Sequence, residues 1–217
     1  MHSSRKVRTS AFPARRPLYY YVTDRRLLRP QDLRSRVRGL IRWGIDFIQI
    51  REKHLDDRDL FLLARNVVAD ARSTDCRVLV NGRADVALAA GAHGVHLPSS
   101  GLRPGDLRPW LPDGFLVGVS VHSEDEAVRA WTSGADYVLA GPIHATPSKA
   151  GMGPPLGIAR FRGICSSVPV PVLGLGGIDA GTVEAVLDAG AAGVAAIRLF
   201  QEGSEIDFRE GRTFRTP

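Results

Sequence analysis

The sequence has few cysteines and no long hydrophobic run. Its 217 residues include two cysteines, Cys76 and Cys165, and no Cys-x-x-Cys pair. This excludes a disulfide scaffold and a cysteine-based zinc site, and we expect both thiols to be reduced in a cytoplasmic protein. No apolar run approaches the roughly 18 residues that a transmembrane helix needs. We therefore expect a globular protein with no membrane partner.

Lysine is also scarce, although the chain is basic. The net charge is +6, and the 29 basic residues include only three lysines, Lys6, Lys53 and Lys149. The arginines are spread evenly and no nucleic-acid-binding motif with interleaved aromatic residues is present, so we expect no nucleic-acid partner. In a chain that almost always uses arginine, the internal lysines are candidates for a chemical role, because lysine is a compact point charge.

The sequence divides into one folded region and two polar ends. Residues 1–17 are basic and without hydrophobic periodicity, which is typical of a disordered extension. They lack the apolar core of a secretory signal, and their arginine- and serine-rich, acid-free composition leaves an organelle transit peptide open. We expect a single domain over residues 18–202 and a C-terminal tail over residues 203–217.

Short apolar runs alternate with amphipathic stretches throughout the folded region. Most runs are continuously apolar, as expected for strands buried on both faces. They are Leu18–Val22, Phe47–Ile50, Val78–Val80, Gly94–Leu97, Leu116–Val121, Tyr137–Ala140, Val170–Leu175 and Val194–Ile197. Apolar residues at helical spacing predict helices between them. These are Asp32–Trp43, Asp59–Ala71, Arg83–Ala90, Glu124–Trp131, Ile158–Ile164 and Thr182–Ala189.

This alternation predicts a small (β/α)8 TIM barrel, a single α/β domain. A doubly wound open sheet is the alternative, but no GxGxxG follows the first run, where Thr23 and Asp24 stand. Functional residues of TIM barrels lie at the C-terminal ends of the strands. The residues that follow each apolar run are therefore the candidates for a site.

The end of the second run carries an amide and two cations. Strand alternation places Gln49, Arg51 and Lys53 on one side, facing the barrel mouth. Burying two cations without an anion would be costly, so the pattern predicts an anion-binding site; a salt-bridged surface end is the alternative. Asn81, after the third run, adds an amide, whereas Asp85 is expected to serve the start of the next helix.

Two histidines lie at neighbouring run ends. His96 is near the end of the fourth run, and Ser120 and His122 are at the end of the fifth. An isolated histidine is more often a packed residue than a catalyst, but two at adjacent strand ends favour acid–base chemistry. We take His122 as the catalytic candidate and His96 and Ser120 as binding candidates.

Two later segments suit a phosphate group. The loop Gly141–Pro154 carries Thr146, Ser148 and Lys149 between glycines, and could wrap a phosphate and close over a substrate; an ordinary surface loop is the alternative. Gly176 and Gly177 follow the seventh run, before an expected helix start at Ile178 and Asp179, where TIM barrels commonly bind phosphate. Arg198, after the eighth run, adds a cation.

In combination these segments resemble the thiamine phosphate synthase/TenI superfamily. The resemblance runs from about residue 18 to about residue 200 and rests on IQIREK, VGVSVHS, GADYVLAGPIHATPSK and VLGLGGI, in that order. Its synthases join a pyrimidine pyrophosphate to a thiazole phosphate with Mg²⁺. The resemblance implies that pyrophosphate and pyrimidine contact Gln49, Arg51, Lys53 and Asn81. It implies that Thr146, Ser148 and Lys149 hold the thiazole phosphate or the pyrophosphate, and that Gly176 and Gly177 hold the thiazole phosphate.

The chain departs from the synthase pattern at the metal. Synthases carry an aspartate directly after the asparagine of strand three and another shortly after the histidine of strand four. Here Gly82 takes the first position, and the segment Pro98–Gly101 contains no carboxylate. Because Mg²⁺ prefers carboxylate oxygens, we expect no metal and no cofactor, with Mg²⁺ required only if the protein is a synthase. We therefore place the chain closer to the TenI branch, which includes metal-independent thiazole tautomerases.

Three functions are compatible with these residues. The first is a thiazole tautomerase of thiamine biosynthesis, in which His122 removes one proton and returns one. The second is thiamine phosphate synthase, and the third is a non-catalytic, regulatory binder of thiamine metabolites. The expected partner is a small phosphorylated thiazole, and homo-oligomerisation is left open.

Overall fold

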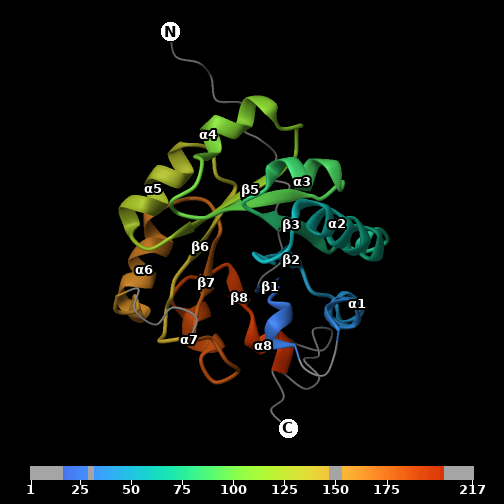
Figure 1. The fold of residues 1–217 in the computed structure, drawn as a ribbon. Helices are drawn as coiled ribbons and strands as arrows, with labels where there is room; N and C mark the ends of the chain where they lie inside the picture. Colours follow the sequence, from blue (N-terminus) through green and yellow to red (C-terminus); the bar gives the residue numbers. More distant parts are fainter. Residues whose placement is uncertain (1–16, 29–31, 147–152, 203–217) are drawn as a thin grey trace.

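Eight parallel strands form a closed barrel in which each strand pairs with the next and β8 pairs with β1 (Figure 1). The computed structural model describes residues 17–28, 32–146 and 153–202. The strands are β1 (Leu18–Val22), β2 (Phe47–Ile50), β3 (Arg77–Asn81), β4 (Gly94–Leu97), β5 (Leu116–Val121), β6 (Tyr137–Ala140), β7 (Val172–Leu175) and β8 (Gly193–Ala196). The predicted TIM barrel is confirmed. The predicted N-terminal extension, apart from Pro17, and the predicted C-terminal tail lie outside the described residues.

Helices cover the outside of the barrel (Figure 1). All six predicted helices are present, as α1 (Leu33–Trp43), α2 (Asp57–Ala71), α3 (Ala84–Ala89), α5 (Glu124–Thr132), α6 (Gly157–Ser167) and α7 (Val183–Asp188). The short helices α4 (Pro104–Leu107) and α8 (Arg198–Glu202) were not predicted, because four or five residues are too few for a periodic pattern. Two 3₁₀ turns, η1 (Arg25–Leu27) and η2 (Arg108–Trp110), complete the set.

Local chemistry accounts for the element boundaries. The Asp32 carboxylate accepts hydrogen bonds from the backbone N–H groups of Arg34 (2.8 Å) and Ser35 (3.0 Å), which starts α1. Gly44, with φ of 91°, ends the same helix in the left-handed conformation. The seventh strand begins at Val172 rather than at the predicted Val170, since the intervening Pro171 has no N–H to donate to a strand partner.

Alternation along the strands separates two hydrophobic cores. The inner core fills the barrel and contains Leu18, Tyr20, Val22, Phe47, Leu79, Leu116, Tyr137, Leu139, Leu173 and Ala195. The outer core lies between the barrel and the helices and includes Tyr19 and Tyr21. In β5, Gly118 leaves room for the inner Tyr137, because a Cβ at this position would overlap the tyrosine ring. The inner core therefore closes the barrel below its mouth.

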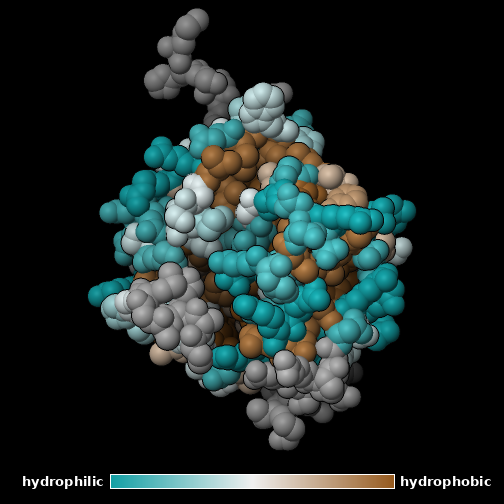
Figure 2. Space-filling model, in the orientation of Figure 1, coloured by the Kyte–Doolittle hydropathy of each residue, from teal (hydrophilic) through white to brown (hydrophobic). Residues whose placement is uncertain are grey.

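Hydrophilic side chains dominate the face of the molecule shown in Figure 2, with hydrophobic patches exposed between them. In the part of the chain that the structure describes, no helix is both long and apolar enough to cross a membrane.

Candidate active site

A cavity of about 560 Å³ opens at the C-terminal ends of the strands, and every strand contributes to its wall. This is the end of a TIM barrel at which function is expected. Most of the candidate residues line the cavity: Gln49, Arg51, Asn81, His96, Ser120, His122, Thr146, Gly176, Gly177 and Arg198. The fold therefore brings together residues from all parts of the chain, as predicted for the residues that follow the apolar runs.

The structure does not place three of the candidate residues at the cavity. Lys53 is exposed and does not line the cavity. The prediction that it faces the mouth is wrong, because β2 ends at Ile50 and Lys53 lies in a turn, where strand alternation no longer applies. Ser148 and Lys149 lie outside the described residues.

The His122 side chain is held in one tautomer. Its Nδ1 contacts the carbonyl oxygen of Gly141, and a carbonyl can only accept a hydrogen bond, so Nδ1 carries the proton. The other ring nitrogen, Nε2, is the basic one and lies 3.4 Å from the Ser99 hydroxyl. The backbone N–H of His122 donates to Glu126 (2.7 Å) at the start of α5. A half-buried imidazole, whose Nε2 lone pair faces the Ser99 hydroxyl, thus lies at the cavity wall.

Arg51 supplies positive charge to the cavity. Its backbone N–H donates to the hydroxyl of the fully buried Thr23 (3.0 Å), which fixes the chain where β2 ends. Within the described ranges no carboxylate lies at ion-pair distance from the half-buried Arg51 guanidinium. A partly desolvated cation without an acidic partner favours binding of an anion.

Gly176 and Gly177 have a packing role that their sequence position did not reveal. Both have positive φ, 97° and 65°. A Cβ at Gly176 would lie 2.7 Å from Cβ of Pro142, and one at Gly177 would lie 2.8 Å from the Ala145 carbonyl oxygen. The glycines thus let the β7–α7 connection pack against the β6–α6 loop. The predicted helix start at Ile178 is wrong: a turn follows the glycines, and α7 begins at Val183.

The side chains at the cavity do not fit a cation held by protein carboxylates. Asp179 is the one acidic residue among the described lining residues, and its Oδ1 already accepts hydrogen bonds from Gly181 N (3.0 Å), Thr182 N (3.0 Å) and Thr182 Oγ1 (2.9 Å). No group of three or more histidine, cysteine or acidic side chains is placed for metal binding anywhere in the described residues. Mg²⁺ sites in proteins usually combine one or two carboxylates with substrate phosphates, and the described lining residues offer Asp179 alone for this role.

Sequence reasoning missed two residues beneath the cavity, Tyr20 and Tyr137. Both are fully buried, and their hydroxyl groups lie 2.9 Å apart. Tyr20 also donates to Gln49 (3.0 Å), and Tyr137 contacts His96 Nδ1 (3.2 Å). The available signal was a tyrosine in an otherwise apolar buried strand, since such a hydroxyl needs a polar partner.

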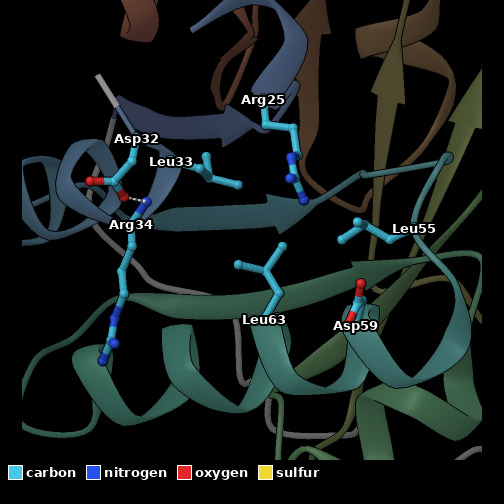
Figure 3. A pocket seen from close by; sticks show the side chains of 7 residues that line it. All are labelled: Arg25, Asp32, Leu33, Arg34, Leu55, Asp59 and Leu63. Atoms are coloured by element: carbon cyan, nitrogen blue, oxygen red, sulfur yellow. Dashed lines mark hydrogen bonds between the residues drawn. The ribbon is translucent and has the colours of Figure 1, made fainter. Parts of the chain in front are cut away.

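A second pocket, of about 410 Å³, lies outside the barrel between η1, α1 and α2 (Figure 3). Its polar groups are largely used in the fold: Asp32 caps α1, and Arg34 pairs with Asp70 on α2 (2.9 Å). Leu33, Leu55 and Leu63 form its apolar part. Few polar groups remain free to converge on a ligand there, so the mouth of the barrel is the better candidate.

Comparison with known proteins agrees with this geometry. The model of the thiamine monophosphate synthase family matches residues 19–200. The chain is 43% identical to a putative thiamine-phosphate synthase of Geobacter sulfurreducens and 44% identical to a thiamine-phosphate synthase of Methanoculleus marisnigri, covering in each case 82% of this chain and 84% of the relative. It also superposes on the structure of thiamine phosphate pyrophosphorylase from Pyrococcus furiosus with a TM-score of 0.75 and 33% identity, covering 83% and 85% of the two chains.

These names favour the synthase over the tautomerase among the three predicted functions, and they give no support to a placement nearer the TenI branch. The resemblance seen in the sequence motifs is confirmed over the whole barrel. The chain therefore belongs to the thiamine phosphate synthase/TenI superfamily, a family of thiamine biosynthesis.

Proposed function

We propose that this protein is a metal-independent isomerase of a thiazole phosphate, in which His122 transfers the proton. The observation that carries the proposal is a combination among the described residues of the cavity wall: an imidazole that carries its proton on Nδ1 and leaves Nε2 as the base, cations for an anionic ligand, and no paired carboxylates. Proton transfer needs the first two features and does not need the third.

The proposed reaction converts a carboxythiazole phosphate from its exocyclic-alkene tautomer to the aromatic ring. His122 Nε2 takes the proton from the ring carbon, and the electron pair of that C–H bond forms a C=N bond to the ring nitrogen. The electrons of the existing ring C=N bond form a ring C=C bond, and those of the exocyclic double bond move to its outer carbon, which receives the proton back from His122. The Gly141 carbonyl holds Nδ1–H throughout and stabilises the imidazolium.

Binding in this proposal depends on the two arginines at the mouth. Arg51 faces one anionic group of the substrate from the end of β2, and Arg198, at the start of α8, lies on the same side of the barrel, since only β1 separates β8 from β2. Aromatisation supplies the driving force. A single acid–base group, which contributes about 10²- to 10⁴-fold, is then sufficient catalysis.

Thiamine phosphate synthase is the second candidate, because the names of the relatives favour it. For this candidate the divalent ion would have to be held mainly by the pyrophosphate of the substrate, since the described lining residues offer one carboxylate, Asp179, whose Oδ1 already accepts three hydrogen bonds.

One assay separates the candidates. The purified protein is given the alkene tautomer, or the pyrimidine pyrophosphate together with the thiazole phosphate, each with and without EDTA. We expect isomerisation that EDTA leaves unchanged and that is lost in His122→Ala. Mg²⁺-dependent release of pyrophosphate without isomerisation would replace this proposal by the synthase. Binding of both ligands with neither activity would replace it by the regulatory binder.

A further inference from the structure

A chain of six polar side chains crosses the interior of the barrel beneath the cavity. Each is hydrogen-bonded to the next, and the six come from six different strands. In order they are Ser120 (β5), His96 (β4), Tyr137 (β6), Tyr20 (β1), Gln49 (β2) and Asn81 (β3), with links of 2.9, 3.2, 2.9, 3.0 and 2.9 Å. Ser120, His96, Gln49 and Asn81 line the cavity, and the buried Tyr20 and Tyr137 lie beneath it. The two tyrosines therefore connect the cavity wall at β4 and β5 with the wall at β2 and β3.

The amide of Gln49 determines the direction of every bond. The Oε1 atom of Gln49 can only accept, so Tyr20 uses its one hydroxyl proton to donate a hydrogen bond to Gln49. Tyr20 must then accept from Tyr137, and Tyr137 must accept from His96 Nδ1–H. A neutral histidine protonated on Nδ1 has a lone pair on Nε2, so Ser120 donates to it. At the other end Gln49 Nε2 donates to Asn81 Oδ1.

Burial keeps the middle of the chain in this state. Tyr20, Tyr137 and His96 are 0 to 1% exposed. Burial raises the pKa of both tyrosines, so their hydroxyls stay protonated. Burial, together with the nearby Arg51 charge, lowers the pKa of His96 to about 3, which keeps the imidazole neutral. Reversing the direction would require both amides to flip and His96 to change tautomer.

The two ends therefore present opposite chemistry to a ligand. The Ser120 hydroxyl donates its hydrogen bond to His96, so only its lone pairs are available to a ligand in the cavity. The Asn81 oxygen is occupied by Gln49, so this side chain offers its amide N–H groups. Asn81 ends β3, and the neighbouring strand β2 leads into the Arg51 cation. One side of the cavity donates and is positive, whereas the other accepts.

We propose that this polarised chain orients the ligand, with Tyr20 and Tyr137 as positioning residues. An anionic group, such as a carboxylate or phosphate, goes to the Asn81 side, and a group with an N–H or O–H donor goes to Ser120. The inference deepens the proposed function, because it takes the same cavity as the ligand site. It holds for either of the two candidate reactions.

The tautomer of the His96 imidazole tests the proposal without any substrate. In ¹⁵N NMR spectra of the labelled protein at pH 7, with His96→Gln used for assignment, we expect His96 protonated on Nδ1. In Tyr137→Phe, Nδ1 loses its acceptor, and we expect the proton on Nε2, donated to Ser120. Tyr20→Phe should have the same effect, because it frees the Tyr137 proton for Nδ1. A wild-type His96 protonated on Nε2, or a tautomer that neither variant changes, would overturn the proposal.

Tyr21→Phe is the matched control. Tyr21 is also a buried tyrosine of β1, but its hydroxyl accepts from Gln201 (2.9 Å) in the outer core and is not part of the chain. This variant should leave the His96 tautomer unchanged. A change as large as in Tyr20→Phe would indicate a general packing effect and would contradict a role for the polarised chain.

Binding gives the second readout. Two probes are compared by calorimetry, a methylthiazole ethyl phosphate with an amino group at C2 and the same compound with a carboxylate there. Tyr137→Phe should weaken binding of the amino probe, relative to binding of the carboxylate probe, by about fivefold or more. This difference in affinity should vanish when Ser120→Ala is added. Equal changes for both probes would overturn the proposal. Neither measurement depends on turnover, so a failed isomerase assay leaves this test intact.

Discussion

The two ends of the barrel use similar residues for opposite purposes. At the N-terminal end, Asp46, His93 and Asp136 stand just before β2, β4 and β6, and each accepts a backbone N–H from the preceding strand, at 2.8, 3.0 and 2.7 Å. At the C-terminal end, polar side chains such as Arg51 and His122 line the cavity. At the N-terminal end these polar groups form hydrogen bonds within the fold, whereas at the C-terminal end they are available to a ligand.

His93 and His96 show this difference within one segment. His93 Nδ1 holds the β3 backbone at Val78, so this side chain acts as a structural acceptor. His96, three residues later, belongs to the hydrogen-bonded chain that ends at the cavity. Residue type alone therefore does not indicate function in this barrel. Position along the strand does, because all the strands are parallel and all their C-terminal ends meet at one mouth.

The largest expected contrast is between His122→Ala and His93→Ala. The first should lower the isomerisation rate by about 10²- to 10⁴-fold with little change in the free energy of unfolding. The second should keep the rate and lose about 1–3 kcal/mol of stability, since the Val78 N–H loses its acceptor. Steady-state kinetics and urea unfolding measure the two quantities, and a comparable rate loss in both variants would contradict the division between the ends.

His96 should make stability pH-dependent. The unfolded chain protonates this residue below about pH 6.5, whereas burial lowers its pKa in the folded protein to about 3. Protonation thus favours unfolding as the pH falls from about 6.5 towards 3, by up to roughly 1.4 kcal/mol per pH unit and on the order of 4–5 kcal/mol in all.

Comparing unfolding of wild type and His96→Gln across this range isolates the residue, because His93, whose pKa is also lowered by burial, is common to both proteins. The decline should be shallower in the variant. Parallel curves for the two proteins would show that His96 is not held neutral.

Asp136→Ala should lower the free energy of unfolding by about 3 kcal/mol. Its carboxylate accepts from the Val117 backbone (2.7 Å) and pairs with Arg108 (2.6 Å), and both donors would lose this partner. The isomerisation rate per folded molecule should not change, because these contacts lie at the N-terminal end. A rate loss at full folding would show that the two ends are coupled.

The smallest expected effect is a difference in ligand affinity between Arg51→Ala and Lys53→Ala. Arg51 lines the cavity, and its removal should weaken binding of thiazole phosphate by roughly thirtyfold, about 2 kcal/mol. Lys53 is exposed and lies outside the cavity lining, so its removal should change affinity by less than about twofold at physiological salt. Isothermal titration calorimetry measures both, and equal losses would restore Lys53 to the site.

Much of this arrangement was predictable from local pattern. Five strands, β1, β2, β4, β5 and β6, have the predicted bounds to the residue, because apolar strand-forming runs end there at glycine, proline or polar residues. The order of the strands then places Gln49, Asn81, His96 and Ser120 at a common mouth. The position of Lys53 was predicted wrongly because strand alternation was extended three residues beyond the predicted strand end at Ile50.

The barrel, and the end of it that carries the chemistry, follow from the amino-acid sequence alone, because hydrophobic periodicity and parallel strand order are local and repetitive properties. The use of each polar group depends on contacts that form only when the chain folds. Tyr20 and Tyr137 are 117 residues apart, and Asp136 meets its Arg108 partner only after folding. The direction of a hydrogen-bonded chain depends on which donors meet which acceptors in space, and no single stretch of sequence contains that information.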